Sequence, residues 1–116
     1  MTNYLPRLAP VFHALADPTR GAVVARLAEG PASVGALAEP FRMALPTFLQ
    51  HLKVLEAAGL VVSEKQGRVR MVRIRAAPLA EAEDWLARRR REWEAKLDRL
   101  QAFVEALETE TKEKDH

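Results

Sequence analysis

The chain has 116 residues, a formal net charge of +2 and no cysteine. Hydrophobic residues make up 48% of it and charged residues 29%, a balance typical of one small globular domain with a single core. The absence of cysteine excludes disulfides, thiolate catalysis and cysteine-ligated zinc. Because the sequence has neither a membrane-length apolar run nor a signal peptide, we expect a cytoplasmic protein that does not enter a membrane.

Basic and acidic residues are unevenly distributed along the chain. Residues 1–75 contain 10 Lys and Arg against 5 Asp and Glu, whereas residues 76–116 contain 8 against 11. A basic first part favours contact with a polyanion such as DNA.

Helix signals dominate the first half of the chain. A short helix is expected from about Leu8. Asp17-Pro18 then supplies an N-cap and a first helical residue for a second helix, which Gly30-Pro31 ends. Ser33 can cap a third helix, "VGALAEPF".

The pattern continues with a fourth helix and then changes period. The fourth helix lies in "MALPTFLQHLKVLEAAGLV", with Pro46 in its first turn and Gly59 just after its last turn. β-Branched residues on either side of Gln66-Gly67 predict a two-stranded hairpin, closed by Pro78. From Leu79 to about residue 110 no Gly or Pro interrupts the chain, which predicts one long helix.

Together these elements describe a mainly α-helical fold with a small β-hairpin, a winged helix-turn-helix with a long C-terminal dimerisation helix. We expect a single domain over residues 1–110 and a disordered tail at 111–116. Within the domain, the helix-turn-helix is expected at about 33–58, the wing at about 61–75 and the terminal helix at about 79–110.

On a helical wheel, the fourth helix has one apolar and one largely polar face. Phe48, Leu52 and Leu55 mark the apolar face, and we expect Leu45 to be partly buried at its edge. The outer face can read DNA, because an amide pairs with adenine, a lysine reaches a phosphate or guanine, and a leucine packs on a thymine methyl group. An ordinary surface helix with a polar outer face would show the same pattern. The candidate DNA-reading residues are Pro46, Thr47, Leu49, Gln50 and Lys53.

The hairpin carries a cluster of cations opposed only by Glu64. A glycine-tipped ribbon of this kind beside a helix-turn-helix is suited to phosphate contact, and a solvated basic strand pair is the alternative. Arg68→Ala or Arg73→Ala is therefore expected to weaken binding to all DNA sequences alike. The candidate wing residues are Lys65, Arg68, Arg70 and Arg73.

The segments "FHALADPTRGAVVARL" and "LPTFLQHLKVLEAAGLVVSEKQGRVRMVRI" resemble the ArsR/SmtB family of bacterial winged-helix repressors, with a match from about Tyr4 to Ile74. The resemblance implies a homodimer whose paired fourth helices enter successive major grooves while the wings contact the flanking backbone. Family members often carry Ser or Gln where this chain has Ala44 and Leu45, and Ser where it has Leu49. These departures affect the operator sequence more than DNA binding itself.

Family members that sense metals use cysteines on the third helix, and Ser33 and Gly35 stand at those positions here. A second family site, on the terminal helix, uses histidine, and residues 79–115 contain none. We therefore expect no metal site and no cofactor, with His13 and His51 in structural roles. Some cysteine-free relatives repress without an effector or answer to an apolar ligand, and the sequence leaves both open.

The terminal helix carries leucines and tryptophans at heptad-like spacing, which suits packing against a partner helix or against its own domain. We favour a dimer interface, because so long a helix outreaches a small globule. The candidate interface residues are Tyr4, Leu8, Phe12, Trp85, Leu86, Trp93, Leu97, Leu100, Val104 and Leu107.

The run Arg88–Arg91 is expected to be a charge-paired surface rather than a second DNA site, because its arginines have acidic partners four residues away. The expected pairs are Asp84–Arg88, Arg88–Glu92 and Arg90–Glu94.

The leading hypothesis is a sequence-specific transcriptional regulator, a homodimeric repressor that binds a palindromic operator in double-stranded DNA without a metal cofactor. One alternative is a winged-helix protein-interaction module that lacks DNA reading, which Ala44, Leu45 and Leu49 would favour. Another is a family-type repressor controlled by an unidentified small apolar ligand. The sequence has no glycine-rich phosphate loop and no cluster of histidine with carboxylates, so we do not expect an enzyme. It identifies no effector.

Overall fold

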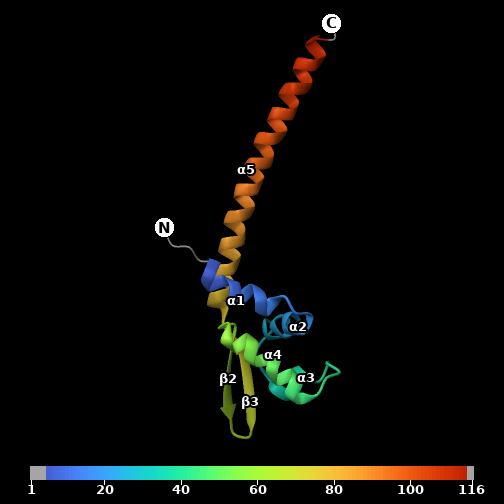
Figure 1. Ribbon diagram of the computed structural model, residues 1–116. Helices are drawn as coiled ribbons and strands as arrows, with labels where there is room; N and C mark the ends of the chain where they lie inside the picture. Colours follow the sequence, from blue (N-terminus) through green and yellow to red (C-terminus); the bar gives the residue numbers. More distant parts are fainter. Residues whose placement is uncertain (1–4, 115–116) are drawn as a thin grey trace. The chain divides into compact units, whose positions relative to one another are not determined.

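The computed structural model describes residues 5–114, and by their contacts the residues divide into two units, Met1–Ala82 and Glu83–His116. The first unit contains the helix-turn-helix and the wing, and the second contains most of the last helix. The elements are α1 (Leu5–Leu15), α2 (Pro18–Leu27), β1 (Ala32–Ser33), α3 (Val34–Ala38), α4 (Leu45–Ala57), β2 (Val61–Gln66), β3 (Val69–Ile74) and α5 (Ala76–Lys114) (Figure 1).

Two helices open the fold. α1 begins at Leu5, earlier than the expected Leu8. α2 begins as expected, because the Asp17 carboxylate accepts a hydrogen bond from the Arg20 amide at 3.0 Å and Pro18 lies in the first turn, where the N–H that it lacks has no helical partner. α2 ends at Leu27, before the expected Gly30-Pro31.

The helix-turn-helix is formed by α3 and α4. Ser33 caps α3 as expected, with its hydroxyl accepting a hydrogen bond from the Ala36 amide at 3.1 Å. α3 ends at Ala38, short of the expected "VGALAEPF", and Pro40 follows with no N–H to extend the helix. The ring of Phe41 then stacks on that of Phe48 at 5.7 Å between centroids, which ties the turn to α4.

The end of α4 fixes where the wing begins. Gly59 has a φ of +77°, and the two amides that follow Ala58 bond back to the last turn: Gly59 N to Glu56 O at 3.0 Å and Leu60 N to Leu55 O at 3.0 Å. This pair of bonds is the Schellman motif, which needs a left-handed residue at this position and so confirms the expected role of Gly59. The chain reverses there and enters β2.

A three-stranded antiparallel sheet replaces the expected two-stranded hairpin, with strand order β1-β3-β2. β1 pairs Ala32 with Val72 and Ser33 with Met71. It was missed because it has two residues, neither of them β-branched or aromatic, and because one of them is also the helix cap. The β2–β3 turn is Gly67-Arg68, one residue later than expected, and the positive φ of Gly67 (+65°) is the type II′ hairpin geometry.

The core of the first unit lies where α4 contacts α1, α2 and β2. On α4, Phe48, Leu52 and Leu55 are 0–4% exposed, as the helical wheel predicted. Burial of such side chains is the main favourable term in folding, so this stripe fixes the rotation of α4 about its axis. The largest fully buried side chains are Phe48, Leu8, Leu27, Leu55, Leu60, Val23 and Val72.

α5 is longer than expected at both ends. It begins at Ala76, so Pro78 lies in its first turn, where a proline is tolerated, instead of closing the hairpin. At the other end it runs to Lys114 and includes residues 111–114, which we expected in a disordered tail. Among residues 5–114, no helix is long and apolar enough to cross a membrane.

Ala44 leaves the start of α4 without a side-chain cap, although its backbone (φ −64°, ψ 146°) has the conformation of an N-cap residue. We predict that Ala44→Ser raises the free energy of unfolding by about 1 kcal/mol, because a serine hydroxyl can accept from an unpaired amide of the first turn. Urea denaturation measures the difference. Ala57→Ser, at the other end of the same helix, is the matched control and should cost about 0.5 kcal/mol. An equal gain from both substitutions would contradict the capping explanation.

Candidate nucleic-acid interface

The outer face of α4 carries all five predicted DNA-reading residues. Because the buried stripe faces the core, the opposite side chains are directed to solvent. Leu49, the most apolar of them, keeps 38% of its surface exposed. The five exposed residues are Pro46, Thr47, Leu49, Gln50 and Lys53.

Leu45 corrects one prediction. We expected it to be partly buried at the edge of the apolar face, but it is 53% exposed. It is the first residue of α4, and no residue of this helix before Phe48 is buried, so the first turn lies outside the packed core. Two leucines one turn apart, Leu45 and Leu49, are therefore exposed on α4.

The wing cations do not share one face of the ribbon. Lys65 and Arg70 are directly paired across β2 and β3, so their side chains point to the same face as the buried Val61 and Val72. Arg73 is on the opposite face, where its guanidinium lies 3.5 Å from the Glu64 carboxylate.

A chain of hydrogen bonds links α4 to the wing. The Ser63 hydroxyl donates to the Glu56 carboxylate at 2.8 Å, and the Arg70 guanidinium donates to the Ser63 hydroxyl at 3.1 Å. Beside this chain is a hollow of about 210 Å³ between α4 and the ribbon. Its lining residues are Leu49, Leu52, Lys53, Glu56, Ser63 and Arg70.

Sequence reasoning missed the roles of Glu56 and Ser63. The alternation along β2 places Ser63 on the same face as Val61, toward α4, but the register of the ribbon against the helix is a tertiary feature that no local pattern reports. The predicted recognition helix and wing therefore border one hollow, and the side chains that join them were not foreseen.

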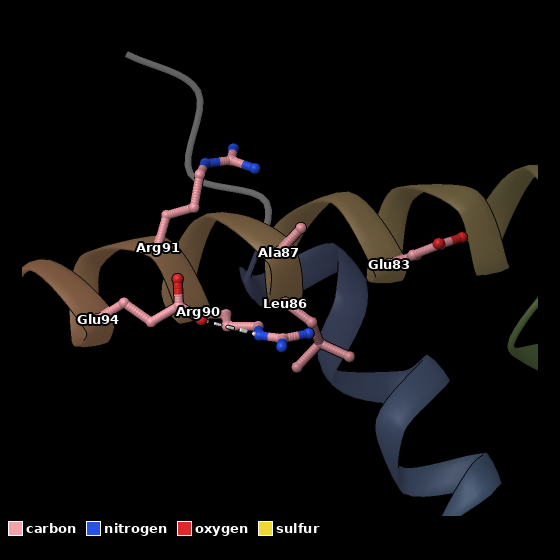
Figure 2. Close-up of a pocket in the computed structure, with 6 residues that line it drawn as sticks. All are labelled: Glu83, Leu86, Ala87, Arg90, Arg91 and Glu94. Atoms are coloured by element: carbon pink, nitrogen blue, oxygen red, sulfur yellow. Dashed lines mark hydrogen bonds and ion pairs between the residues drawn. The ribbon is translucent and has the colours of Figure 1, made fainter.

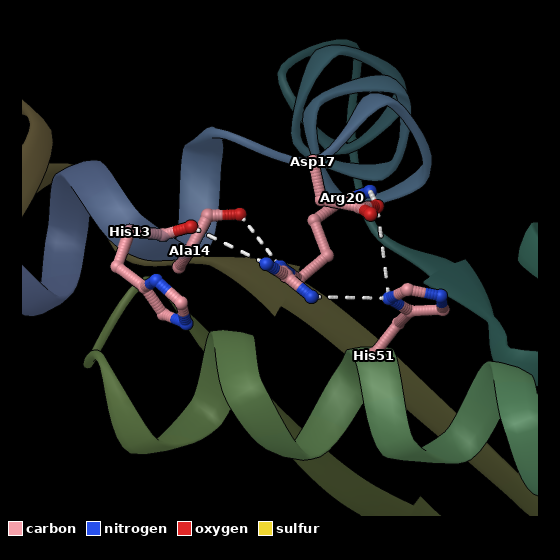
Figure 3. A network of polar contacts seen from close by, with 5 residues as sticks. All are labelled: His13, Ala14, Asp17, Arg20 and His51. Atoms are coloured by element: carbon pink, nitrogen blue, oxygen red, sulfur yellow. Dashed lines mark hydrogen bonds and ion pairs between the residues drawn. The ribbon is translucent and has the colours of Figure 1, made fainter.

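His51 takes part in a polar network at the core edge of α4 (Figure 3). The Arg20 guanidinium donates to Ala14 O at 2.8 Å and to His13 O at 3.3 Å, and it lies 3.3 Å from His51 Nδ1. His51 Nδ1 is also 3.7 Å from the Asp17 carboxylate. The network joins the end of α1, the start of α2 and the middle of α4, so the structural role expected for His51 is confirmed. The His13 side chain is exposed, and it is the backbone carbonyl of this residue that takes part.

The exposed side of α5 bears the predicted apolar stripe. Leu86, Trp93 and Leu97 are 51–63% exposed, and the stripe continues with Leu100, Val104 and Leu107. Phe103, which we did not predict, is 61% exposed at its edge.

The predicted interface residues near the first helix differ from the α5 stripe in their exposure to solvent. Leu8 is fully buried within the chain, so it belongs to the protomer's own core and we remove it from the interface. Phe12 is half-buried, and Tyr4 lies outside the described residues.

The arginine run of α5 is largely charge-paired. Two of the expected pairs are present, Asp84–Arg88 at 3.1 Å and Arg90–Glu94 at 3.1 Å, but Glu92 pairs with Arg89 at 3.0 Å instead of Arg88. Arg89 also lies over the half-buried ring of Trp85, at 5.4 Å from its centroid.

A hollow of about 490 Å³ runs along this part of α5, with Leu86 and Ala87 among charged side chains (Figure 2). All of its lining residues belong to the one helix, so it is an uncovered helix face and not an enclosed ligand cavity. In the part of the chain that the structure describes, no group of three or more His, Asp or Glu residues could hold a metal ion.

The pKa of the Asp17 carboxyl is lowered, chiefly by the hydrogen bond from the Arg20 amide. Partial desolvation opposes this shift by raising the pKa. The His51 and Arg20 side chains and the Thr19 amide lower the pKa further. A lowered pKa in the folded state means that the charged carboxylate stabilises the fold above the ordinary value of 3.8 and that this contribution is lost as the pH falls below it.

We therefore predict that the Tm of the wild type falls more steeply than the Tm of Asp17→Asn as the pH drops below 3.8. The variant keeps the capping oxygen but lacks the charge. The difference in Tm between the two proteins across this range is the readout. Parallel acid curves would show that the Asp17 charge does not stabilise α2.

Comparison with known proteins supports the same architecture. Residues 15–64 match the model of the "Helix-turn-helix domain" family. The HTH-type transcriptional regulator Rv2034 of Mycobacterium tuberculosis is 45% identical over 69 residues, which is 60% of this chain and 64% of that protein. The HTH-type transcriptional repressor SmtB of the same species is 39% identical over 64 residues and 47% of its own length, so the chain spans less than two thirds of these curated relatives.

Two solved structures extend the match. An ArsR family transcriptional regulator, RHA00566, is 49% identical with a TM-score of 0.76, covering 81% of this chain and 97% of that one. An ArsR-like transcriptional regulator from Rhodococcus sp. RHA1 is 31% identical with a TM-score of 0.74, covering 88% and 96%. Regulators of this kind are generally not enzymes. On the fold, the helix-turn-helix and these relatives, the chain belongs to the ArsR family of winged helix-turn-helix transcriptional regulators.

Proposed function

We propose that the protein is a sequence-specific regulator that binds double-stranded DNA as a homodimer, represses transcription from a palindromic operator in the cytoplasm, and needs no metal cofactor. The observation that carries the proposal is the position of the outer face of α4 and the cationic ribbon on either side of one hollow. A helix that enters a major groove brings its neighbouring wing to the adjacent phosphates.

On α4, the Gln50 amide can form the paired hydrogen bonds that select adenine, and Lys53 can reach a phosphate or a guanine. On the ribbon, Lys65, Arg68 and Arg70 supply cations at or next to the face that borders α4. Arg73 points to the other face and is paired with Glu64, so we give it a smaller part than the sequence suggested.

Dimerisation is supported by the apolar stripe of α5. Large apolar side chains that are 43–63% exposed along one line of a helix are not typical of a surface that stays in water. Their spacing is that of a seam between two helices. The occupant that we propose is a second copy of the chain, as the resemblance to the family implies.

Two facts support the proposal that the protein represses transcription without a metal. The M. tuberculosis relative SmtB is by name a repressor. This chain has no cysteine, and residues 79–115 contain no histidine, so neither family site for a metal has its usual ligands. No effector is assigned.

A protein-interaction module is the second candidate, and the exposure of Leu45 (53%) and Leu49 (38%) on α4 is what favours it. Fluorescence anisotropy separates the two functions. The titration compares the DNA upstream of the protein's own gene with a scrambled duplex, at two salt concentrations. The proposed regulator prefers the native fragment and loses affinity as salt rises, whereas an interaction module binds neither duplex even at low salt.

Arg70→Ala and Arg73→Ala are a matched pair for the wing. We predict that Arg70→Ala weakens binding to native and scrambled DNA alike and reduces the slope of log K against log salt by about one, because one phosphate contact is lost. Arg73→Ala should change the slope less, since its guanidinium is on the opposite face and paired. The same anisotropy titrations give both slopes. Equal effects of the two substitutions would mean that the DNA does not approach from the α4 side.

Gln50→Ala should act on specificity instead. We predict that it lowers the discrimination at a single base position by about 1–3 kcal/mol and leaves the salt slope unchanged. Competition with operator variants that differ at one base pair measures this. An unchanged preference at every position would show that Gln50 does not read a base.

Leu97→Glu tests the dimer. We predict that a charge at this 57%-exposed stripe position raises the dimer dissociation constant about tenfold or more, as seen by sedimentation equilibrium. Ala95→Glu adds the same charge at an exposed position on the opposite side of α5 and is the control. If both variants dimerise like the wild type, the stripe is not the interface.

A further inference from the structure

Leu49 holds a specific place in the proposed DNA surface. It borders the hollow between α4 and the ribbon, with Lys53 one turn further along α4 and Arg70 on β3 among the other lining residues. Its 38% exposure means that a substantial part of an apolar side chain faces the space that a DNA edge would enter. That a DNA edge enters this space rests on the proposed function.

The polar groups around the hollow are largely occupied. The Glu56 carboxylate accepts from Ser63, and the Ser63 hydroxyl accepts from Arg70. Lys53 is exposed and, among residues 5–114, has no hydrogen-bond or ion-pair partner. The surface presented to an incoming duplex is therefore an apolar patch at Leu49 with cations beside it.

The chemistry of the major groove offers one match to such a patch. Base edges there carry hydrogen-bond donors and acceptors, and the one methyl group among the four standard bases is that on C5 of thymine, where cytosine has only a hydrogen. A leucine opposite a polar base edge would leave that edge unpaired, whereas a leucine opposite a methyl group buries both apolar groups from water. The cations beside it can hold the flanking phosphates and so bring the methyl group to the leucine.

We propose that Leu49 reads the C5-methyl group of a pyrimidine in the major groove, and that this contact makes the operator methyl-dependent at one base pair of each half-site. Thymine carries this group, and 5-methylcytosine carries it too. The contact adds specificity without adding a hydrogen bond.

The test begins with selection of duplexes from a random pool by the full-length protein. In the enriched sequence, each thymine is then replaced in turn by deoxyuridine, which removes the methyl group and leaves the Watson–Crick pairing. We expect one thymine per half-site at which uracil weakens binding about fourfold, the effect of one buried methyl-sized group. At the other thymines the replacement should have no effect.

Two variants assign the effect to its side chain. With Leu49→Ala, thymine and uracil should bind equally well at the sensitive position. With Leu45→Ala, which removes an exposed leucine one turn earlier and outside the lining of the hollow, the fourfold preference for thymine should remain. Circular dichroism checks that both variants are folded, and the wild-type uracil scan needs no variant.

The outcomes separate this inference from the proposed function. If no sequence is enriched from the pool, both are overturned. If a sequence is enriched but none of its thymines is sensitive to uracil, or if the preference for thymine persists in Leu49→Ala, the methyl contact alone is overturned. Comparison of cytosine with 5-methylcytosine at the sensitive position then identifies the source: a gain of similar size extends the contact to methylated cytosine, and no gain restricts it to thymine.

Discussion

The burial of Phe48, Leu52 and Leu55 is the constraint on which the rest of the candidate site depends. Once these three side chains occupy the core between α1, α2 and β2, the rotation of α4 is fixed and its other face must meet the solvent. Thr47, Gln50 and their neighbours face outward for that reason alone. A residue on this helix therefore acquires its solvent-facing position from the packing of other residues that are buried in the core.

The second constraint is the short path from α4 to the wing. The left-handed Gly59 ends the helix within one residue, Leu60 is buried directly after it, and the Arg75 amide bonds to Leu60 O at 2.8 Å where β3 ends. The ribbon is thus held at both strands beside the end of α4. The Glu56–Ser63–Arg70 hydrogen bonds act at the same place, and they keep one wing cation at the edge of the helix.

Local signals in the sequence were sufficient where the chemistry is local. Asp17 and Ser33 predict the start of a helix because their side-chain oxygens can cap it, and Gly59 predicts a helix C-terminus because glycine adopts a left-handed backbone. The structure confirms all three. The alternation of β2 and β3 likewise predicted the ribbon, apart from a one-residue shift of its turn.

Features that depend on tertiary contacts were not predictable in the same way. β1 exists because β3 offers its free edge to residues 32–33, which have no strand pattern of their own. Leu45 follows the wheel of a buried residue but lies beyond the end of the core, whereas Leu8 looks like an interface leucine and is in fact enclosed by its own protomer. In each case periodicity gives the direction of a side chain, and only the neighbouring elements decide what lies in that direction.

The measurement that tests the central claim most directly is an NMR titration of the isotope-labelled protein with a specific duplex. If α4 and the wing form one DNA-binding surface, backbone amide shifts should change together at Thr47, Gln50 and Lys53 and at Arg68 and Arg70, while the arginine run of α5 stays unperturbed. Changes concentrated at Arg88–Arg91, with none on α4 or the ribbon, would contradict the account.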